Sequence, residues 1–160
     1  MRTQNYGRVV VTTSSTGLYG NFGQSNYGAA KLALVGLMNT LKIEGRKHDI
    51  RVNAISPVAA TRMTDNLMPP EMLSKFLPEH VTPGVVYLAS RDAPNGAIPT
   101  AGAGVFAVAQ MVETEGVFLG HAATAEAVRD SWTNITNYTG AEPYPAGMVQ
   151  TQKFLRKSVE

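Results

Sequence analysis

The chain has 160 residues, 44% of them hydrophobic and 16% charged, which is typical of one folded domain and not of a disordered chain. It contains no cysteine, which excludes disulfide scaffolds and thiolate metal sites. The net charge of +2 comes from scattered basic residues, and the small basic clusters at 45–49 and 153–157 lack the interleaved aromatics of a base-stacking surface. We therefore expect no nucleic-acid partner.

Membrane and metal chemistry are not expected either. No segment approaches the ~20 consecutive apolar residues that cross a bilayer, so we expect no membrane span. Residues 1–8 lack the apolar core of a signal peptide, which makes the cytoplasm the expected location. The three histidines are far apart and show no metal-ligand spacing, at His48, His80 and His121.

Two short apolar runs, residues 8–12 and 51–55, are bounded by glycine, serine and proline and predict strands. The segment between them, about 26–47, is rich in Ala, Leu, Lys and Met and predicts a long helix, with Ser25 available as its cap. Its apolar positions recur at helical spacing, at Leu34, Met38 and Leu41. This order predicts a βαβ unit, with parallel strands and a right-handed crossover.

The second half of the chain predicts shorter elements. Two short helices are expected around 71–76 and 84–90, followed by one strand somewhere in 97–112, where Pro99 favours an edge or irregular strand. Thr124 can cap a helix that runs to about residue 138. The apolar face of that helix is expected at Val128, Trp132 and Ile135. The fold class is therefore α/β.

The chemistry is concentrated in residues 14–31, SSTGLYGNFGQSNYGAAK. Tyr27 and Lys31 are four residues apart, so on a helix they share one face. A tyrosine is a weak base at neutral pH, and a nearby ammonium stabilises its phenolate form. Tyr27 can then exchange a proton with an alcohol or a carbonyl oxygen, and Ser14, at the strand end, can hydrogen-bond the same oxygen. We identify Ser14, Tyr27 and Lys31 as candidate catalytic residues.

This Ser-x12-Tyr-x3-Lys arrangement, with VNAISP at 52–57, resembles the short-chain dehydrogenase/reductase family. Within the family, the chain is similar to the (3R)-hydroxyacyl-CoA dehydrogenase domains of peroxisomal multifunctional β-oxidation enzymes, also at ATRMT (60–64) and TAEAVRDSWTNI (124–135). The resemblance implies that Tyr27 is the acid/base and that Ser14 orients the substrate oxygen. It implies that Lys31 assists Tyr27 and bonds the ribose of NAD or NADP.

The resemblance also places Pro57, Val58 and Thr61 beside the nicotinamide. Two positions depart from the family pattern: Val58 stands where the family commonly has glycine, and Thr61 follows the proline by four residues instead of five. Nothing before Arg8 can supply the strand, glycine-rich turn and helix that cradle a pyrophosphate. We therefore expect residues 1–160 to be a single partial domain, the catalytic half plus a helical tail from about residue 120. The expected fold is the C-terminal part of a Rossmann-like, doubly wound parallel sheet without its N-terminal dinucleotide-binding strands.

Three functions remain open from the sequence. The first is an NAD(P)-dependent oxidoreductase that interconverts a hydroxyl and a carbonyl, on a small hydroxy or keto substrate that includes 3-hydroxyacyl-CoA as a candidate. The second is a truncated, inactive fragment that oligomerises and binds no dinucleotide. The third is a related activity such as epimerisation or dehydration. Because residues 9–11 would leave a flat apolar strand edge uncovered, we expect self-association through helix 26–47 or poor solubility.

Overall fold

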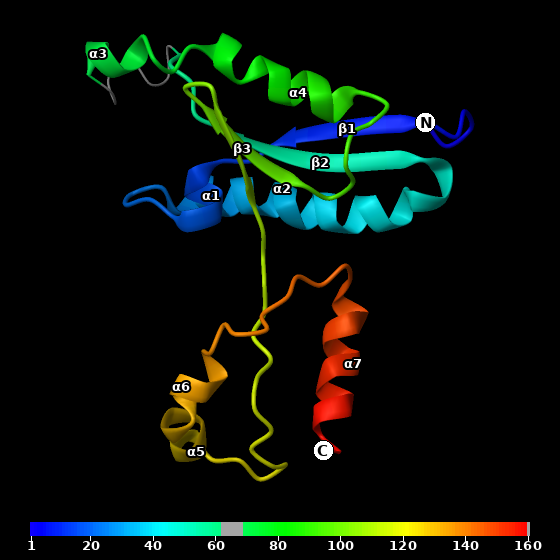
Figure 1. Cartoon of the computed structure of the whole chain (residues 1–160), viewed down its shortest axis with the longest axis vertical. Helices are drawn as coiled ribbons and strands as arrows, with labels where there is room; N and C mark the ends of the chain where they lie inside the picture. The colour runs from blue at the N-terminus through cyan, green and yellow to red at the C-terminus, as the bar shows by residue number, and fades with distance from the viewer. Residues whose placement is uncertain (62–68, 160) are drawn as a thin grey trace. The chain divides into compact units, whose positions relative to one another are not determined.

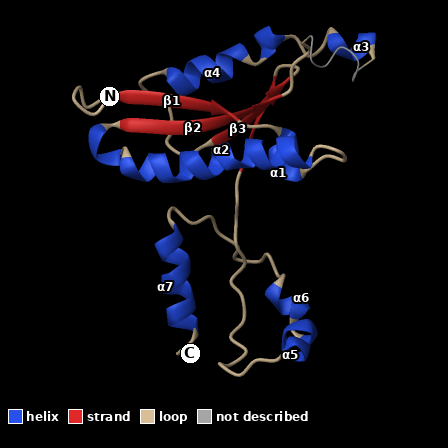
Figure 2. Ribbon diagram, turned by 180° about the vertical axis from the view of Figure 1, so that it is seen from behind, coloured by secondary structure: helices blue, strands red, loops and turns tan. Residues whose placement is uncertain are grey.

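The computed structural model describes residues 1–61 and 69–159. The chain divides into two compact units, Met1–Ala109 and Gln110–Glu160. In the first unit, a sheet lies between helices α1 (Ser15–Tyr19) and α2 (Ser25–Glu44) on one face and helix α4 (Thr82–Ala89) on the other (Figures 1 and 2). This layering is that of an α/β fold.

The sheet of the first unit has four strands in the order β1-β2-β3-β4. Their bounds are β1 Gly7–Thr12, β2 Ile50–Pro57, β3 Ile98–Gly102 and β4 Val105–Ala109. The β1–β2 and β2–β3 pairs are parallel, and the β3–β4 pair is antiparallel. The predicted α/β class and the parallel βαβ unit are confirmed.

The expectation of one strand in 97–112 is wrong, because the segment folds into a hairpin. β3 and β4 are joined by Ala103 and Gly104, with φ of 51° and 78°, which is the pattern of a two-residue type I′ turn. β3 is also not an edge strand, since it lies between β2 and β4. Pro99 is tolerated there because the β2–β3 ladder, Ser56↔Thr100 and Pro57↔Ala101, begins just after it.

Helix α2 (Ser25–Glu44) is the long helix that the sequence predicts between β1 and β2. Ser25 is its first helical residue, and Gln24 occupies the N-cap without a side-chain hydrogen bond, so the predicted serine cap is wrong. Met38 is fully buried on the sheet, and Leu41 packs beside it. The shorter helical elements of this unit are α1 Ser15–Tyr19, η1 Arg46–His48, α3 Pro70–Leu73, η2 Pro78–His80 and α4 Thr82–Ala89.

The core of the first unit consists of two apolar clusters, one on each face of the sheet. The cluster under α2 contains Val35, Met38, Val52, Ala54 and Ile98. The cluster under α4 contains Ile55, Val81, Leu88 and Ala101. β2 contributes to both clusters because successive side chains of a strand point to opposite faces.

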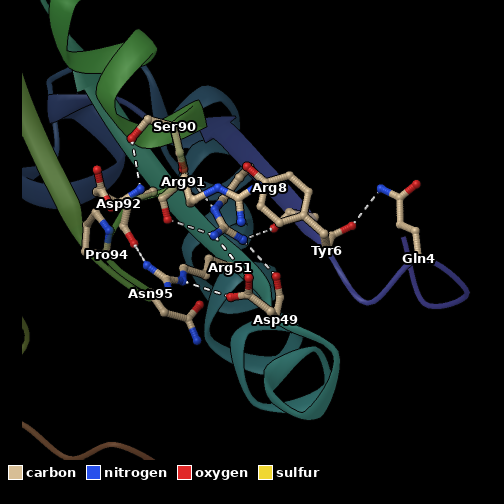
Figure 3. A network of polar contacts seen from close by, with 12 residues as sticks. Gln4, Tyr6, Arg8, Asp49, Arg51, Ser90, Arg91, Asp92, Pro94 and Asn95 are labelled. Atoms are coloured by element: carbon tan, nitrogen blue, oxygen red, sulfur yellow. Dashed lines mark hydrogen bonds and ion pairs between the residues drawn. The ribbon is translucent and has the colours of Figure 1, made fainter.

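A network of polar contacts joins the N-terminal ends of β1 and β2 to the loop after α4 (Figure 3). The Arg8 guanidinium, with a side chain 4% exposed, donates to the carbonyls of Ser90 and Arg91 (both 2.9 Å) and contacts the Asp49 carboxylate at 3.3 Å. Arg51 donates to the other oxygen of that carboxylate at 3.1 Å. Partial desolvation would raise the pKa of Asp49, but the hydrogen bonds from Arg8 and Arg51 outweigh it and hold that pKa below its usual range.

The second unit contains three helices, α5 Ala125–Asp130, α6 Trp132–Ile135 and α7 Gly147–Lys157. Thr124 caps α5 as predicted, accepting from the N–H of Ala127 at 3.3 Å. The single helix expected to residue 138 is instead two short helices that meet at Ser131. Trp132, expected on an apolar face, is 58% exposed. None of the described helices has the length and apolarity that a membrane crossing requires.

Candidate active site

The three candidate catalytic residues lie where β1 ends and helices α1 and α2 begin. Ser14 follows β1 and forms the N-cap of α1, its Oγ accepting from the N–H of Thr16 at 3.2 Å. Tyr27 and Lys31 lie on the first two turns of α2. The strand end therefore presents Ser14, and the helix that follows presents the other two residues.

Tyr27 and Lys31 share one face of α2, as their spacing predicts. The Lys31 ammonium lies 5.6 Å from the centroid of the Tyr27 ring, and Tyr27 is 40% exposed. The same ammonium donates to the backbone carbonyl of Thr12 at 2.9 Å. Lys31 is thus close enough to act electrostatically on the tyrosine ring, while its hydrogen bond goes to the end of β1.

Close packing between α1 and α2 fixes this arrangement. A Cβ on Gly17 would lie 2.9 Å from the Cβ of Lys31, and a Cβ on Gly28 would lie 3.2 Å from the carbonyl oxygen of Thr16. Thr13 adds a hydrogen bond from its hydroxyl to the backbone carbonyl of Lys31 at 2.8 Å. The glycines let α1 approach α2 closely, so the segment that carries Ser14 is held against the helix that carries Lys31.

The predicted nicotinamide-contacting residues lie at the end of β2. Pro57 is the last residue of that strand, and the N–H of Val58 donates to the carbonyl of Ala101 at 2.7 Å. Thr61 is exposed and follows Ala60, whose N–H donates to the carbonyl of Phe76 at 2.6 Å. Of the 60–64 segment named in the resemblance, residues 62–64 lie outside the described residues.

A cavity of about 240 Å³ opens beside these residues. Its apolar lining comes from Tyr19, Val58, Phe76 and Val105, and its hydroxyl groups come from Ser15, Ser56 and Thr100. Ser14, Tyr27 and Lys31 do not line it, although Ser15 is the neighbour of Ser14. The cavity therefore adjoins the candidate catalytic residues without enclosing them.

The residues present fit one end of an NAD(P) molecule. A dinucleotide needs groups beside the nicotinamide ribose and a backbone cradle for the pyrophosphate. Tyr27 and Lys31 can serve the ribose, and Pro57 and Val58 lie at the neighbouring strand end. No strand, glycine turn and helix of the pyrophosphate type occurs in 1–61 or 69–159, since β1 leads into Thr13-Ser14-Ser15-Thr16 and the five-residue α1.

Sequence reasoning missed the residues that hold the site together. Thr13 is 1% exposed and anchors the backbone of α2, and the hydroxyl of Thr16 donates to the side-chain oxygen of Gln24 at 2.9 Å. Gly28 was not singled out either, although Thr16 packs against it. The signal for the threonines was the unbroken run Thr12-Thr13-Ser14-Ser15-Thr16, in which hydroxyls are available to the following helices.

The chain is similar to known proteins over most of its length. Residues 1–71 match the short chain dehydrogenase family. The chain is 47% identical over 142 residues to a short-chain type dehydrogenase/reductase of Mycobacterium tuberculosis, covering 88% of this chain and 50% of that protein. It is 43% identical over 145 residues to peroxisomal multifunctional enzyme type 2 of Mus musculus, covering 88% of this chain and 20% of that enzyme.

A solved structure gives the same result for the fold. Full-length peroxisomal multifunctional enzyme type 2 from Drosophila melanogaster superposes with a TM-score of 0.86 at 34% identity. The match covers 99% of this chain and 30% of that one. The chain therefore spans half or less of the length of these relatives. The matched residues, the sequence identity and the fold together support the short-chain dehydrogenase family for this chain.

Proposed function

We propose that this chain carries the proton-transferring part of an NAD(P)-dependent oxidoreductase that interconverts a hydroxyl and a carbonyl. The observation that carries the proposal is the grouping of Ser14, Tyr27 and Lys31 at the junction of β1, α1 and α2. We further propose that the fold is the C-terminal part of the complete sheet. The chain covers half of its Mycobacterium tuberculosis relative, so the other half of that relative lies outside the match.

In the proposed mechanism, Tyr27 is the acid/base. When an alcohol is oxidised, its phenolate oxygen takes the hydroxyl proton, and when a carbonyl is reduced, its O–H returns a proton to the developing alkoxide. Lys31 assists Tyr27 from the same face of α2, with its ammonium 5.6 Å from the ring centroid. Ser14 hydrogen-bonds the substrate oxygen and orients it toward Tyr27. A nicotinamide cofactor, when bound, supplies the hydride chemistry at the carbon.

Pro57, Val58 and Thr61 are the residues that we propose to lie beside the nicotinamide. Pro57 and Val58 leave β2 at its carboxyl end, and in open α/β sheets ligands bind beyond the carboxyl ends of strands. The valine at 58 has a side chain that contacts Gly102, where an added Cβ would lie 3.0 Å from the Cβ of Val58. Val58 therefore packs against the strand end that leads into the β3–β4 turn.

The proposed substrate class is a 3-hydroxyacyl thioester, with the coenzyme A ester as the candidate. The apolar lining of the 240 Å³ cavity, with Phe76 and Val105, suits an acyl chain next to the reacting carbon. The resemblance to (3R)-hydroxyacyl-CoA dehydrogenase domains supports the same class and a role in fatty acid β-oxidation. The cytoplasmic location stays a prediction, because the multifunctional relatives are named as peroxisomal.

The test is turnover by the chain joined to the part of its Mycobacterium tuberculosis relative that it does not cover. With a 3-hydroxyacyl-CoA and NAD or NADP, we expect the absorbance at 340 nm to rise as reduced cofactor forms, about one molecule for each substrate molecule oxidised. Tyr27→Phe should lower kcat by about 10²-fold or more, the contribution of a positioned proton donor, with unchanged far-UV circular dichroism. Tyr87→Phe on α4, which loses the same hydroxyl from a side chain 53% exposed, is the matched control. Full activity of the Tyr27 variant would refute the assigned role.

The alternative is that the chain is an inactive fragment that binds no dinucleotide. It is favoured by the missing pyrophosphate cradle among residues 1–61 and 69–159. Titrating the chain alone into NADH and following cofactor fluorescence separates the two readings. Saturable binding at micromolar concentration would contradict the alternative, and the absence of binding would contradict activity of the chain by itself.

We also propose that the chain self-associates through helix 26–47, of which α2 is the main part. Its outward side exposes Leu32, Leu37 and Ile43 to between 43% and 50%. No backbone or side chain lies within 4 Å of a Cβ added at Gly36, so a second helix can approach there. Sedimentation equilibrium measures the mass directly, and a stable monomer at all concentrations would refute this interface.

A further inference from the structure

The cavity beside the candidate catalytic residues has an apolar rim and a polar interior. Tyr19 and Val105, which line it, are 73% and 66% exposed, whereas Ser56 is 2% exposed. Thr100 is half-buried and lies beside Ser56, because the two residues are partners in the parallel pairing of β2 and β3. Paired residues of neighbouring strands project to the same face of a sheet. A ligand that enters past the rim therefore meets two hydroxyl groups in the most buried part of the cavity.

The hydroxyl of Ser56 differs from the other buried polar groups. Buried polar side chains of folded proteins are nearly always hydrogen-bonded. Within residues 1–61 and 69–159, four of the five buried polar residues follow this rule through their side chains, namely Thr13, Thr16, Asn53 and Lys153. The Ser56 hydroxyl makes no side-chain hydrogen bond in the described part of the chain. Since no polar side-chain atom that is sealed off there lacks a partner, the Ser56 oxygen opens to the cavity that it lines.

The other walls of the cavity offer no hydrogen-bonding side chain. A Cβ on Gly102 would lie 3.0 Å from the Cβ of Val58 and 3.3 Å from the ring of Phe76, so these two apolar side chains lie close together over the end of β3. A hydroxyl group can donate one hydrogen bond and accept two. A matching ligand is therefore apolar where it passes Val58 and Phe76 and carries an oxygen at its inner end.

The size of the cavity decides which end of a thioester it can take. Its volume of about 240 Å³ is below the ~300–1,000 Å³ of sites that enclose a drug-sized ligand, and coenzyme A is larger than such ligands. The buried end is therefore the acyl chain, and the coenzyme lies outside. None of the lining residues described belongs to β1, so the cavity does not depend on the unpaired edge of that strand.

We propose that this cavity is a specificity pocket for the acyl chain, and that Ser56 and Thr100 select a chain with a hydroxyl or carbonyl oxygen at its inner end. The two hydroxyls hydrogen-bond that oxygen, while Tyr19, Val58 and Phe76 surround the methylene groups. A site that pairs a ligand oxygen discriminates against the analogue without it, because its own polar groups then stay unpaired. The inference rests on the proposed function for the thioester and deepens it by naming the acyl chain.

Binding of substrate analogues to the full 160-residue chain tests the pocket without turnover. The probes are the N-acetylcysteamine thioesters of hexanoic acid and of 6-hydroxyhexanoic acid, titrated separately and followed by amide shifts in NMR. We expect saturable shifts at Thr100, Ala101 and Val105, which line the cavity. The 6-hydroxyhexanoyl thioester should bind about five- to tenfold more tightly, the gain from one net hydrogen bond. Equal dissociation constants, or no saturable shift at these amides, overturn the pocket.

Substitutions assign the preference to the two hydroxyls. Ser56→Ala and Thr100→Val each remove one hydroxyl with little change in volume, and each should lower the preference to about twofold or less. Thr100→Ser keeps the hydroxyl and should retain the preference. Thr40→Val, which removes an exposed hydroxyl of α2, is the matched control. A full preference in both Ser56→Ala and Thr100→Val, with unchanged circular dichroism, overturns the assignment to these residues.

A third probe identifies which oxygen is recognised. S-hexyl-N-acetylcysteamine is a thioether that has the same chain without the thioester carbonyl, and we expect it to bind about as tightly as the hexanoyl thioester. If the thioester binds five- to tenfold more tightly than the thioether and the terminal hydroxyl adds nothing, the hydroxyls recognise the thioester carbonyl, and the proposed chain-end oxygen is overturned. Full activity of Tyr27→Phe would refute the proposed function without altering any of these dissociation constants.

Discussion

The two units of the chain are held together by different interactions. In Met1–Ala109, fully or nearly fully buried apolar side chains lie on both faces of the sheet, with Met38, Ala54 and Leu88 at 0% exposed. Among residues 110–159, the most deeply buried side chain is that of Lys153, which is 6% exposed. One unit therefore has a hydrophobic core, and the other is organised around a buried cation.

The polar contacts of Lys153 explain the shape of the second unit. Its ammonium donates to the Glu113 carboxylate and, at 2.9 Å, to the carbonyl of Thr114, and Gln150 donates to the other oxygen of Glu113. A backbone bridge between Glu113 and Glu142 completes the unit. These directional polar contacts hold α7 in place, but they bury little apolar surface. Met148 and Leu155 on the same helix are 66% and 65% exposed.

The comparison teaches that the stability of the chain resides mainly in the first unit. Hydrophobic burial is the dominant favourable contribution to folding, whereas a buried ion pair recovers little beyond its own desolvation cost. Substitutions of similar size should then have very different effects in the two units.

The largest effect is expected for Met38→Ala in the first unit. Met38 is fully buried under α2, and removing its side chain leaves a cavity that should cost about 2–5 kcal/mol in the free energy of unfolding. Leu155→Ala in α7 is the matched control, because that side chain is 65% exposed and should change the free energy by about 0.5 kcal/mol or less. Urea unfolding followed by circular dichroism measures both. Equal losses would show that α7 packs into a core that the exposed fractions do not reveal.

The sequence predicted the elements that an apolar core imposes. The strands near 8–12 and 51–55, the long helix between them and the buried Met38 all follow from periodic apolar residues, and the structure has them. It did not predict the β3–β4 hairpin, because Ala103-Gly104 is a weaker turn signal than Asn-Gly. In the second unit the apolar spacing of Val128 and Trp132 suggested burial, but these side chains are exposed. In that unit the helical spacing of apolar residues therefore did not predict a buried face.

The candidate site also has features that the sequence predicted and features that it could not predict. The spacing of Tyr27 and Lys31 was predictable, because i, i+4 positions on a helix always share a face. The position of Ser14 at the strand end followed from the Ser/Thr run after β1. The Thr12 carbonyl as the partner of Lys31 was not predictable, since it depends on which edge of β1 is left unpaired by the strands in residues 1–61 and 69–159. That information lies in the strand order and not in the local sequence.

A smaller, pH-dependent effect is expected in the second unit. The hydrogen bond from Lys153, with help from Gln150, holds the pKa of Glu113 below its usual value, although burial opposes the shift. In Lys153, burial would lower the pKa of the ammonium, but the hydrogen bonds with Glu113 and Tyr144 outweigh burial and raise that pKa. The contribution of Glu113 to the free energy of unfolding is therefore present when the pH is above its unfolded-state pKa near 4.5. It is lost as the pH falls through the lowered pKa of the folded state. The contribution of Lys153 to the free energy of unfolding is present when the pH is below its unfolded-state pKa of 10.5. It is lost as the pH rises through the raised pKa of the folded state.

Trp132, the single tryptophan of the chain, reports on this unit by fluorescence. We expect its signal to change below about pH 4.5, while circular dichroism from the first unit persists further. Lys153→Met should weaken the second unit by about 1–3 kcal/mol, because Glu113 and the Thr114 carbonyl lose their donor. It should also remove the acid transition of Trp132. Lys47→Met, at an exposed position, is the control, and an acid transition that persists in Lys153→Met would show that another group controls it.

The smallest effect is expected at the β3–β4 turn, which belongs to the first unit. Ala103 has a φ of 51°, a left-handed conformation that costs an alanine free energy, and type I′ turns prefer asparagine followed by glycine. Ala103→Asn should therefore stabilise the first unit by about 0.5–1 kcal/mol, since Gly104 already supplies the second position. Ala107→Asn, in β4 with an ordinary strand conformation, is the control and should not stabilise. If the units unfold independently, the urea midpoint by circular dichroism rises in Ala103→Asn while the Trp132 transition stays where it was. A parallel rise in both would show that the hairpin next to the boundary at Ala109 couples them, and the hydrophobic core of the first unit would then also determine the stability of the second.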